Sequence, residues 1–459
     1  MRIEKISVEN YRLFEARAFS FHPHFNLIVG ENGKGKTSLL DLLALGISAW
    51  IENIGPPIES DMPILTYPVT SKEIRRATTN DFRCFLSNES GEARVEFADY
   101  LWIASDWDGI PTGTGEFVSS KWYLKSIGDP TRPSPNRPNE HVDDIDTPEH
   151  EKNFRDNGFD GPTFAPLLRQ GKEILLPLFA FYGCNRLFKH SNNNQKLIQQ
   201  AMEVSYQRRN GYTDWWQASA NAHELMVWIQ KLDIIAYQEK QVPLGLDIVQ
   251  AALRECLEDF DELQFMAKEA QLMVKFRERP PLPFWQLSDG QRTLLAMISD
   301  IVRRAVILNP QLGEKILEET TGIVLIDELD LHLHPKWQRR IIEDLRRTFP
   351  KIQFICTTHS PQLIGEVKPD EIILLRDGQQ IQESQSFGMD SNWILKHIMG
   401  SSDRNVDVAK ELDAIFEWIE EDKFDEAREH IDALRAEIGE HPSLVRAETI
   451  IDRYTRIGE

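Results

Sequence analysis

The sequence predicts an α/β fold, in which a head of parallel strands and helices carries a large mixed α/β to helical insertion and a C-terminal helical extension. Three observations predict it. An apolar strand at residues 25–29 runs into a glycine-rich stretch and then into a helical pattern over 38–49. Residues 281–400 again alternate between apolar strands and helices, which is typical of a parallel sheet. Residues 401–459 are helical and acidic.

Composition narrows the class of protein before any motif is considered. The 459 residues are 41% hydrophobic and 27% charged, with a net charge of −21. This excludes a uniformly basic nucleic-acid coat protein but not a local basic groove. The 4 cysteines show no C-x-x-C spacing, so neither a disulfide framework nor a cysteine zinc site is expected. No apolar run approaches ~18 residues and the first residues do not resemble a signal peptide, so we expect a cytoplasmic protein without a membrane partner.

In the first half of the chain, the secondary structure can be predicted clearly for the first residues and less clearly for those that follow. Residues 2–9 alternate between apolar and polar, as a half-buried strand does, and 93–105 also indicate strands. Residues 127–166 are rich in proline, aspartate and asparagine, which predicts a long surface loop. The apolar run 174–182 fits a buried strand. We expect residues 193–275 to be mostly helical.

The second half alternates regularly between helices and strands. Ser288 is expected to cap a helix that runs to about Leu308. The tail holds 17 acidic and 8 basic residues, and its pattern predicts a capping helical hairpin. Further predicted elements are strands at 322–326, 353–357 and 371–375 and a helix at 336–349. The predicted division of the chain is an N-terminal lobe of the head at 1–50, an insertion at 51–275, a C-terminal lobe of the head at 276–400 and the tail at 401–459.

A phosphate-binding loop is predicted between the strand at 25–29 and the following helix. Gly30-Glu31-Asn32-Gly33-Lys34-Gly35-Lys36-Thr37 matches G-x-x-x-x-G-K-[ST] in that setting. Glycines permit positive φ and bring backbone N–H groups close to phosphates. Lys36 is expected to reach the β- and γ-phosphates, and the Thr37 hydroxyl to bind Mg²⁺. The predicted nucleotide-binding residues are Gly30, Asn32, Gly33, Lys34, Gly35, Lys36, Thr37 and Ser38.

A pair of acids follows a second apolar strand, in GIVLIDELDLHLHP at 322–335. Asp327 and Glu328 stand at the carboxyl end of that strand, where ligands bind in open α/β sheets. Asp327 is predicted to bind Mg²⁺, and Glu328 to polarise the attacking water as a general base. His332 and His334 lack a third metal ligand with suitable spacing, so we interpret them as part of a turn.

Leu287-Ser288-Asp289-Gly290-Gln291 begins 40 residues before Asp327. It resembles the LSGGQ signature of ABC-type ATPases, and the phosphate loop, the signature, the acid pair and His359 occur in that family's order. The resemblance implies that two ATP molecules are bound between two heads placed head to tail, in a homodimer or higher oligomer. It assigns His359 to the γ-phosphate in its own head, as a catalytic residue, and Asp330 to the dimer seam. It assigns the signature to the partner's ATP: Ser288, Asp289, Gly290 and Gln291.

Within that family the chain resembles the RecF and SMC branch of the AAA ATPases more than transporter subunits. Its opening, VENYRLFEARAFSF, is similar to the first strand of that branch, which implies that Arg12 lies near the nucleotide. The long insertion between phosphate loop and signature also belongs to it. A Q-loop glutamine is missing. Arg186, in the strand end FYGCNR, has two open interpretations, a nucleotide contact or a surface arginine.

The motifs GENGxGKTSLL, FYGxxR, LSDGQR, IDELDLHLHP and TTHSPQ together resemble the ATPase subunits of Septu anti-phage systems. That resemblance implies a sensor or scaffold that works with a separately encoded HNH nuclease, and we find no nuclease motif in this sequence. One alternative is a RecF- or SMC-like repair or chromosome ATPase that acts directly on DNA. A transporter motor, disfavoured by the missing Q-loop, and an ATP-locked structural module are further alternatives. Direct DNA binding would need a groove built from one or two of four basic clusters: Arg75-Arg76, Arg208-Arg209, Lys275-Arg277-Arg279 and Arg303-Arg304.

Overall fold

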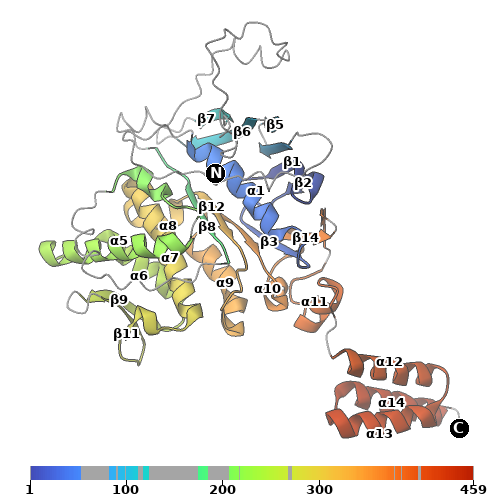
Figure 1. The fold of residues 1–459 in the computed structure, drawn as a ribbon. Helices are drawn as coiled ribbons and strands as arrows, with labels where there is room; N and C mark the ends of the chain where they lie inside the picture. Colours follow the sequence, from blue (N-terminus) through green and yellow to red (C-terminus); the bar gives the residue numbers. More distant parts are fainter. Residues whose placement is uncertain are drawn as a thin grey trace, which may run out of the picture. The chain divides into compact units, whose positions relative to one another are not determined.

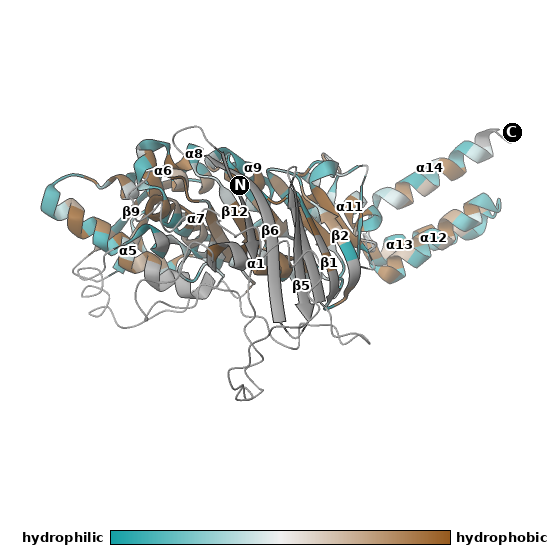
Figure 2. Ribbon diagram, turned by 90° about the horizontal axis from the view of Figure 1, so that it is seen from above, coloured by the Kyte–Doolittle hydropathy of each residue, from teal (hydrophilic) through white to brown (hydrophobic). Residues whose placement is uncertain are grey.

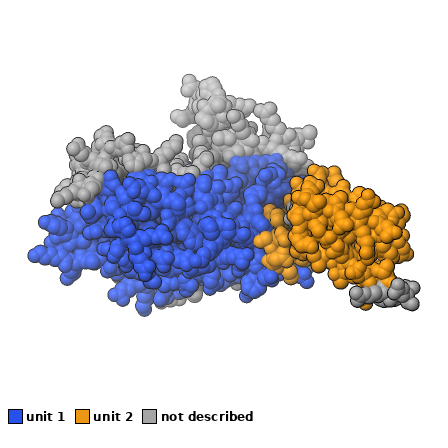
Figure 3. Space-filling view, turned by 90° about the horizontal axis from the view of Figure 1, so that it is seen from below, with its two compact units in different colours: residues 1–388 blue, residues 389–459 orange. Residues whose placement is uncertain are grey.

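The computed structural model describes residues 2–52, 82–88, 91–98, 100–111, 117–123, 174–184, 206–216, 218–266, 271–376, 378–383, 385–401 and 405–457. The chain divides into two compact units, Met1–Gly388 and Met389–Glu459 (Figure 3). The predicted loop at 127–166 and Arg186 lie outside the described residues.

A six-stranded sheet forms the centre of the first unit, in the order β15-β14-β3-β13-β12-β8 (Figure 1). Five strands are parallel, and β15 pairs antiparallel with β14. Every residue of β8, β12 and β13 is buried, as expected for apolar parallel strands covered on both faces. Because β13 lies between β3 and β12, the phosphate loop and the acid pair emerge on either side of it. The strands are β3 (Phe25–Gly30), β8 (Leu178–Tyr182), β12 (Gly322–Ile326), β13 (Ile352–Thr357), β14 (Ile372–Arg376) and β15 (Gln379–Ile381).

Two of the long helices of this unit, α7 and α9, begin at recognisable caps. α7 (Asp289–Leu308) begins at Ser288, whose hydroxyl accepts a hydrogen bond from the N–H of Gln291 in a capping box, as predicted. α9 (Pro335–Thr348) has proline at its first position. α1 (Lys36–Glu52) leaves the phosphate loop directly. Further helices are α5 (Ala218–Glu239), α6 (Leu244–Cys256), α8 (Ile316–Glu319), α10 (Pro361–Gly365) and the 3₁₀ helices η1 (Arg208–Tyr212), η2 (Phe284–Gln286), η3 (Pro310–Lys315) and η4 (Pro369–Glu371).

A second six-stranded sheet contains the N-terminal strands, and α1 contacts strands of both sheets (Figure 1). Its order is β2-β1-β4-β5-β6-β7, with antiparallel neighbours. The predicted strand at 2–9 is β1 of a hairpin whose turn contains Arg12, with φ of 47°. The strands are β1 (Lys5–Tyr11), β2 (Phe14–Ser20), β4 (Phe82–Asn88), β5 (Gly91–Ala98), β6 (Tyr100–Pro111) and β7 (Phe117–Tyr123).

The expectation that residues 193–275 are mostly helical was wrong for their last part. A small antiparallel sheet there has the order β11-β10-β9. Along β10 the burial alternates residue by residue, which is the pattern of a strand with one covered face. The apolar Met273 at a half-buried position between Leu272 and Val274 conceals this pattern in the sequence. The strands are β9 (Phe260–Met266), β10 (Gln271–Phe276) and β11 (Leu282–Pro283).

The predicted helical hairpin is present in the second unit as α13 (Phe424–Ile438) and α14 (Pro442–Ile457), and a third helix, α12 (Val406–Glu420), packs with it. Each helix carries apolar residues on one face and polar residues on the other (Figure 2). The buried faces meet in one core, which includes Ile415, Ile431 and Leu444. Among the described residues no helix is long and apolar enough to cross a membrane. The helices of this unit are α11 (Ser391–His397), α12 (Val406–Glu420), α13 (Phe424–Ile438) and α14 (Pro442–Ile457).

Candidate functional site

The loop after β3 has the backbone conformation that a phosphate loop needs. Gly33 and Gly35 have φ of 77° and 100°, where residues with a side chain are strained. Gly35 is also closely packed, since a Cβ there would lie 2.9 Å from Cζ of Phe14. Lys36 is buried, and its Nζ donates to the carbonyl oxygens of Gly30 at 2.7 Å and Glu31 at 3.0 Å. Asn32 and Thr37 are exposed, and Lys34 and Ser38 are half-buried.

The ammonium group of Lys36 lies near three acidic side chains at the carboxyl ends of the central strands. Burial lowers the pKa of Lys36, and the charges of Asp327, Glu328 and Asp330 oppose that shift. These acids follow β12 and come almost 300 residues after the lysine in the chain. The structure therefore brings the two sequence-predicted motifs into one electrostatic site.

Asp327 connects the phosphate loop to the acid strand. Its carboxylate accepts hydrogen bonds from the Thr37 hydroxyl, at 3.2 Å to Oδ2, and from the Thr357 hydroxyl, at 2.6 Å to Oδ1. A hydroxyl and a carboxylate are oxygen donors of the kind that Mg²⁺ prefers, so these residues fit such an ion. Thr357 belongs to the end of β13, and sequence reasoning missed it. The signal that could have found it is its position two residues before His359 in TTHS.

Glu328 lies next to Asp327 in a strained backbone conformation, with φ of 53°. Such strain persists only where the surroundings impose it, and it concentrates at functional sites. Here the N–H of Glu328 donates to Oγ1 of Thr357 at 2.7 Å, and its carbonyl oxygen accepts from the N–H of Leu331 at 2.9 Å. The side chain is half-buried at the edge of the site.

His359 and Asp330 lie on the same side of the site. Oδ1 of Asp330 accepts from the Thr358 hydroxyl at 2.5 Å and from the N–H of His359 at 3.4 Å. Burial, together with the positive charge of Lys36, lowers the pKa of His359, while the three acids oppose that shift. Its imidazole is therefore biased toward the neutral form, which can accept a proton or a hydrogen bond.

Arg12 lies beside the start of α1. Its Nη1 pairs with Oδ2 of Asp41 at 2.5 Å and contacts the hydroxyl of Ser38 at 3.4 Å. Asp41, a buried residue of α1 that sequence reasoning missed, thus fixes the arginine next to the phosphate loop. The signal for it is only its position one turn after Thr37.

The signature residues lie on an open groove rather than among the residues of the phosphate loop. Ser288 is exposed, and among the described residues the hydrogen bonds of its hydroxyl are with Gln291. The groove has a volume of about 680 Å³. Gly290 is buried, and a Cβ at this position would lie too close to the carbonyl oxygen of His332. The groove is lined by Ser288, Asp289, Gly290, Gln291, His332, Leu333, His334 and Trp337.

The basic clusters differ in how far they could contribute to a DNA groove, since Arg277 and Arg279 are exposed whereas Arg303 and Arg304 are buried. Arg303 and Arg304 are 1% and 0% exposed, and both pair with the buried Asp300. Arg208 donates to the carbonyl oxygen of Leu308 at 2.6 Å, and Lys275 pairs with Asp261 at 2.6 Å. The expectation that Arg303-Arg304 belongs to a solvated basic surface was therefore wrong. Arg75-Arg76 lies outside the described residues.

Comparison with known proteins gives two family matches and several relatives. An AAA domain model matches residues 5–260, and a second AAA domain model matches 172–365. The chain is 41% identical over 160 residues to the Retron Ec83 probable ATPase of Escherichia coli, which is 35% of this chain and 29% of that protein. It is 40% identical over 94 residues to the Septu protein PtuA of Bacillus mycoides, which is 20% of this chain and 12% of that protein. The chain spans less than a third of the length of these relatives.

Matches to repair proteins and solved structures are shorter or more distant. The chain is 44% identical over 41 residues to the RecF protein of Lysinibacillus sphaericus, which is 9% of this chain and 11% of that protein. Among solved structures, the SMC head domain of Pyrococcus furiosus bound to the C-terminal domain of ScpA aligns with this chain at 14% sequence identity and a TM-score of 0.40. The alignment covers 84% of this chain and 96% of the SMC head chain.

Proposed function

Because this chain belongs to the AAA domain family, which an AAA domain model matching residues 5–260 shows, we propose that it binds ATP with Mg²⁺ and hydrolyses the γ-phosphate. The observation that carries the proposal is the meeting of Lys36, Thr37, Asp327, Glu328 and His359 at the carboxyl ends of β3, β12 and β13. Their chemistry is that of phosphoryl transfer, which depends on positioning and charge stabilisation.

Each residue has a part in the proposed reaction. A water attacks the γ-phosphorus, the bond to the β,γ-bridging oxygen breaks, and ADP and phosphate form. Glu328 accepts the proton of the water. Lys36 and the phosphate-loop N–H groups stabilise the charge of the phosphate oxygens, and His359 contacts the γ-phosphate. Thr37 and Asp327 would hold Mg²⁺, which supplies positive charge at the β- and γ-phosphates.

We propose that two copies of the chain complete this site head to tail. The exposed position of Ser288 at the N-terminus of α7 supports this, because the signature groove opens to solvent and leaves the serine free to meet a second copy's nucleotide. In this arrangement Ser288 and Gly290 act on the ATP bound by the partner, and Asp330 lies near the seam.

We propose that the ATPase acts in anti-phage defence and regulates a separately encoded HNH nuclease. The relatives named for retron and Septu systems support a defence role, and the resemblance to Septu ATPases supports the nuclease. The burial of Arg303 and Arg304 in ion pairs reduces the support for direct DNA binding.

The first test is ATP hydrolysis by the full chain. Wild type should release phosphate in the presence of Mg²⁺, whereas Glu328→Gln should lower the rate by about 10²–10⁴-fold and Lys36→Ala should weaken ATP binding. The matched control is Glu319→Gln, which makes the same change at a surface glutamate that pairs with Lys351. This variant should retain the wild-type rate of ATP hydrolysis. If Glu328→Gln hydrolyses ATP at the wild-type rate, the general-base role is wrong.

The second test is purification of the tagged chain from its native operon, followed by mass spectrometry. A stoichiometric protein with HNH-type histidine and asparagine spacing would support the defence complex. Recovery of the chain with DNA alone would support the repair or chromosome role instead, and its DNA binding should then weaken steeply with salt.

A further inference from the structure

The turn that follows the acid pair packs directly against the signature. The N–H of Leu333 donates to the carbonyl oxygen of Asp330 at 3.0 Å, which closes the turn 330–333. Its third residue, His332, has φ of 63° and presents its carbonyl oxygen to Gly290. A Cβ at Gly290 would lie 2.3 Å from that oxygen, so the two segments are in backbone contact. Any shift of the turn must therefore move the signature or separate it from the turn.

The side chain of Gln338, in the first turn of α9, holds this turn in place. Its Nε2 donates to the carbonyl oxygen of Leu333 at 2.9 Å, and its Oε1 accepts from the hydroxyl of Ser360 at 2.8 Å. Ser360 is buried and follows His359 directly. Thus one amide joins the turn 330–333 to the segment that carries His359.

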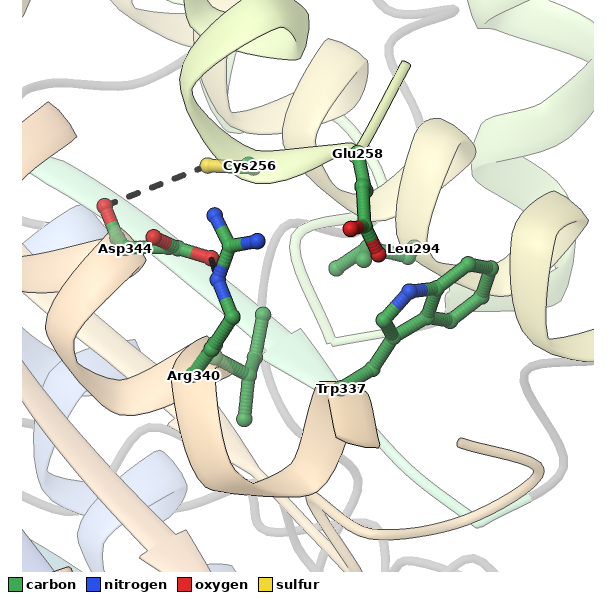
Figure 4. A pocket seen from close by; sticks show the side chains of 7 residues that line it. Cys256, Glu258, Leu294, Trp337, Arg340 and Asp344 are labelled. Carbon is green, nitrogen blue, oxygen red and sulfur yellow. Dashed lines mark hydrogen bonds and ion pairs between the residues drawn. The ribbon is translucent and has the colours of Figure 1, made fainter. Parts of the chain in front are cut away.

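The helix that presents Gln338 is itself fixed to α6 and to the residues that directly follow it. Figure 4 shows Trp337, Arg340 and Asp344 of α9 directed toward Cys256 and Glu258. Two kinds of contact fasten this side of the helix. Lys336 pairs with Glu258 at 2.7 Å, and the buried Sγ of Cys256 lies 3.3 Å from Oγ1 of Thr348. Gln338 therefore acts from a helix that is anchored at both ends.

We propose that Gln338 is a positioning residue that acts through the turn 330–333 on the signature of its own head, and thereby on the nucleotide bound by a second copy. It touches neither nucleotide. The proposal rests on the head-to-tail arrangement given under Proposed function. It predicts that losing the Gln338 amide weakens the nucleotide-bound dimer while ATP binding to the isolated head is preserved.

The test uses Gln338→Met, which keeps the side-chain length and removes both hydrogen bonds, in the full chain carrying Glu328→Gln so that ATP persists. Binding of a fluorescent N-methylanthraniloyl ATP with Mg²⁺ at nanomolar protein measures the isolated head. Sedimentation over a protein concentration series with ATP and Mg²⁺ measures the dimer. We expect the first affinity to stay within about twofold and the dimer to weaken roughly tenfold, which is what the loss of one or two hydrogen bonds costs.

Gln264→Met is the matched control, because it makes the same change at an exposed position of β9 and should alter neither quantity. Gln338→Glu is the second variant: it keeps an acceptor for Ser360 but cannot donate to Leu333, so it should weaken the dimer too. An unchanged dimer in both Gln338 variants overturns the proposal, as does an equal loss of ATP affinity in the isolated head. Failure of the parent chain to bind the ATP probe would instead refute the proposed function, and a parent that binds it without dimerising would refute the dimer and the role of Gln338 together.

Discussion

The Thr357 hydroxyl donates a 2.6 Å hydrogen bond to Oδ1 of Asp327. Oγ1 of Thr357 in turn accepts a hydrogen bond from the N–H of Glu328 at 2.7 Å, so a single buried hydroxyl contacts both acids of the site. Because β13 lies between the strand of the phosphate loop and the strand of the acids, its last residue is the one that can reach across the site's centre. The Asp327 carboxylate and the Glu328 backbone are thus held from a third strand.

Replacing Thr357 with valine should therefore impair catalysis without removing any residue that contacts ATP. Valine keeps the branched shape but leaves the Asp327 carboxylate and the Glu328 N–H without this partner. We expect kcat to fall by about 10- to 100-fold, the range for losing a hydrogen bond to a charged group. Steady-state hydrolysis over a range of Mg²⁺ concentrations measures it. Thr357→Ser should restore most of the rate, and a valine variant as active as wild type would contradict the role given to Thr357.

The charge of Lys36 should control the protonation of His359. Burial and Lys36 lower the pKa of this histidine, whereas the neighbouring acids raise it. In Lys36→Met the acids are no longer opposed by the lysine, so the pKa of His359 should rise and more of the imidazole should be protonated at pH 6. NMR titration of ¹³C-labelled histidine measures it. Lys315→Met, at an exposed position, should leave the titration of His359 unchanged, and a fall of the pKa in Lys36→Met would refute the electrostatic account.

The buried ion cluster on α7 should contribute strongly to stability. Asp300 is fully buried, pairs with Arg303 and Arg304, and accepts from the Tyr182 hydroxyl at 2.9 Å. Asp300→Asn leaves two buried guanidinium groups without their carboxylate, which should cost about 3–5 kcal/mol of unfolding free energy. Urea denaturation measures the loss. Asp289→Asn, which breaks an exposed pair with Arg292 on the same helix, should cost less than about 1 kcal/mol.

The same cluster should make stability depend on pH in a defined direction. Burial raises the pKa of Asp300, but Arg304 and Arg303 outweigh it, so its pKa in the folded state is lowered. Its contribution is therefore complete above the ordinary aspartate pKa and is lost as the pH falls through the lowered value. Wild type should lose more stability than Asp300→Asn over that acidic range, as urea midpoints at successive pH values would show. Equal losses in the two proteins would contradict this assignment.

Among the cysteines whose burial the structure describes, the exposed thiol should react faster with an alkylating reagent than the buried thiols. Cys184 is exposed, whereas Cys256 and Cys356 are buried, and burial raises the pKa of Cys256 to about 12. Since the thiolate is the reactive form, iodoacetamide at pH 8 should modify Cys184 in the folded protein and spare Cys256 and Cys356 until urea is added. Peptide mass spectrometry reads the sites. Modification of Cys256 before unfolding would show that α6 and α9 separate more readily than their contacts indicate.

The parts of the site that the sequence predicted are those with a local pattern. The phosphate loop, the acid pair and the cap of α7 each combine a short motif with a flanking strand or helix, and the structure places those elements accordingly. Residues that act from a distance gave no such pattern. Thr357, Asp41 and Gln338 are ordinary polar residues whose partners lie on other elements, so they become visible only once the sheet brings those elements together.

The errors have physical reasons of the same kind. Arg303 and Arg304 look like a surface pair in the sequence, but Asp300 lies three and four residues before them and supplies a buried counter-charge on the same helix face. In β10, intermediate residues separate the buried ones, so the composition resembles that of an amphipathic helix. Period 2 and period 3.6 are hard to distinguish over so few residues.

The order of the central sheet has a consequence for how the chain is made. β3 is complete once the ribosome has passed residue 30, but its two neighbours, β13 and β14, are not finished until Arg376. At about 5–20 residues per second, synthesis of the intervening segment of about 350 residues takes roughly 20 to 70 s. Throughout that interval the apolar segment of β3 has neither of its neighbouring strands to pair with. A nascent chain with such an exposed segment is prone to chaperone binding or aggregation. The proposed ATP site needs β3, β12 and β13 together, so ATP would stabilise only the completed head.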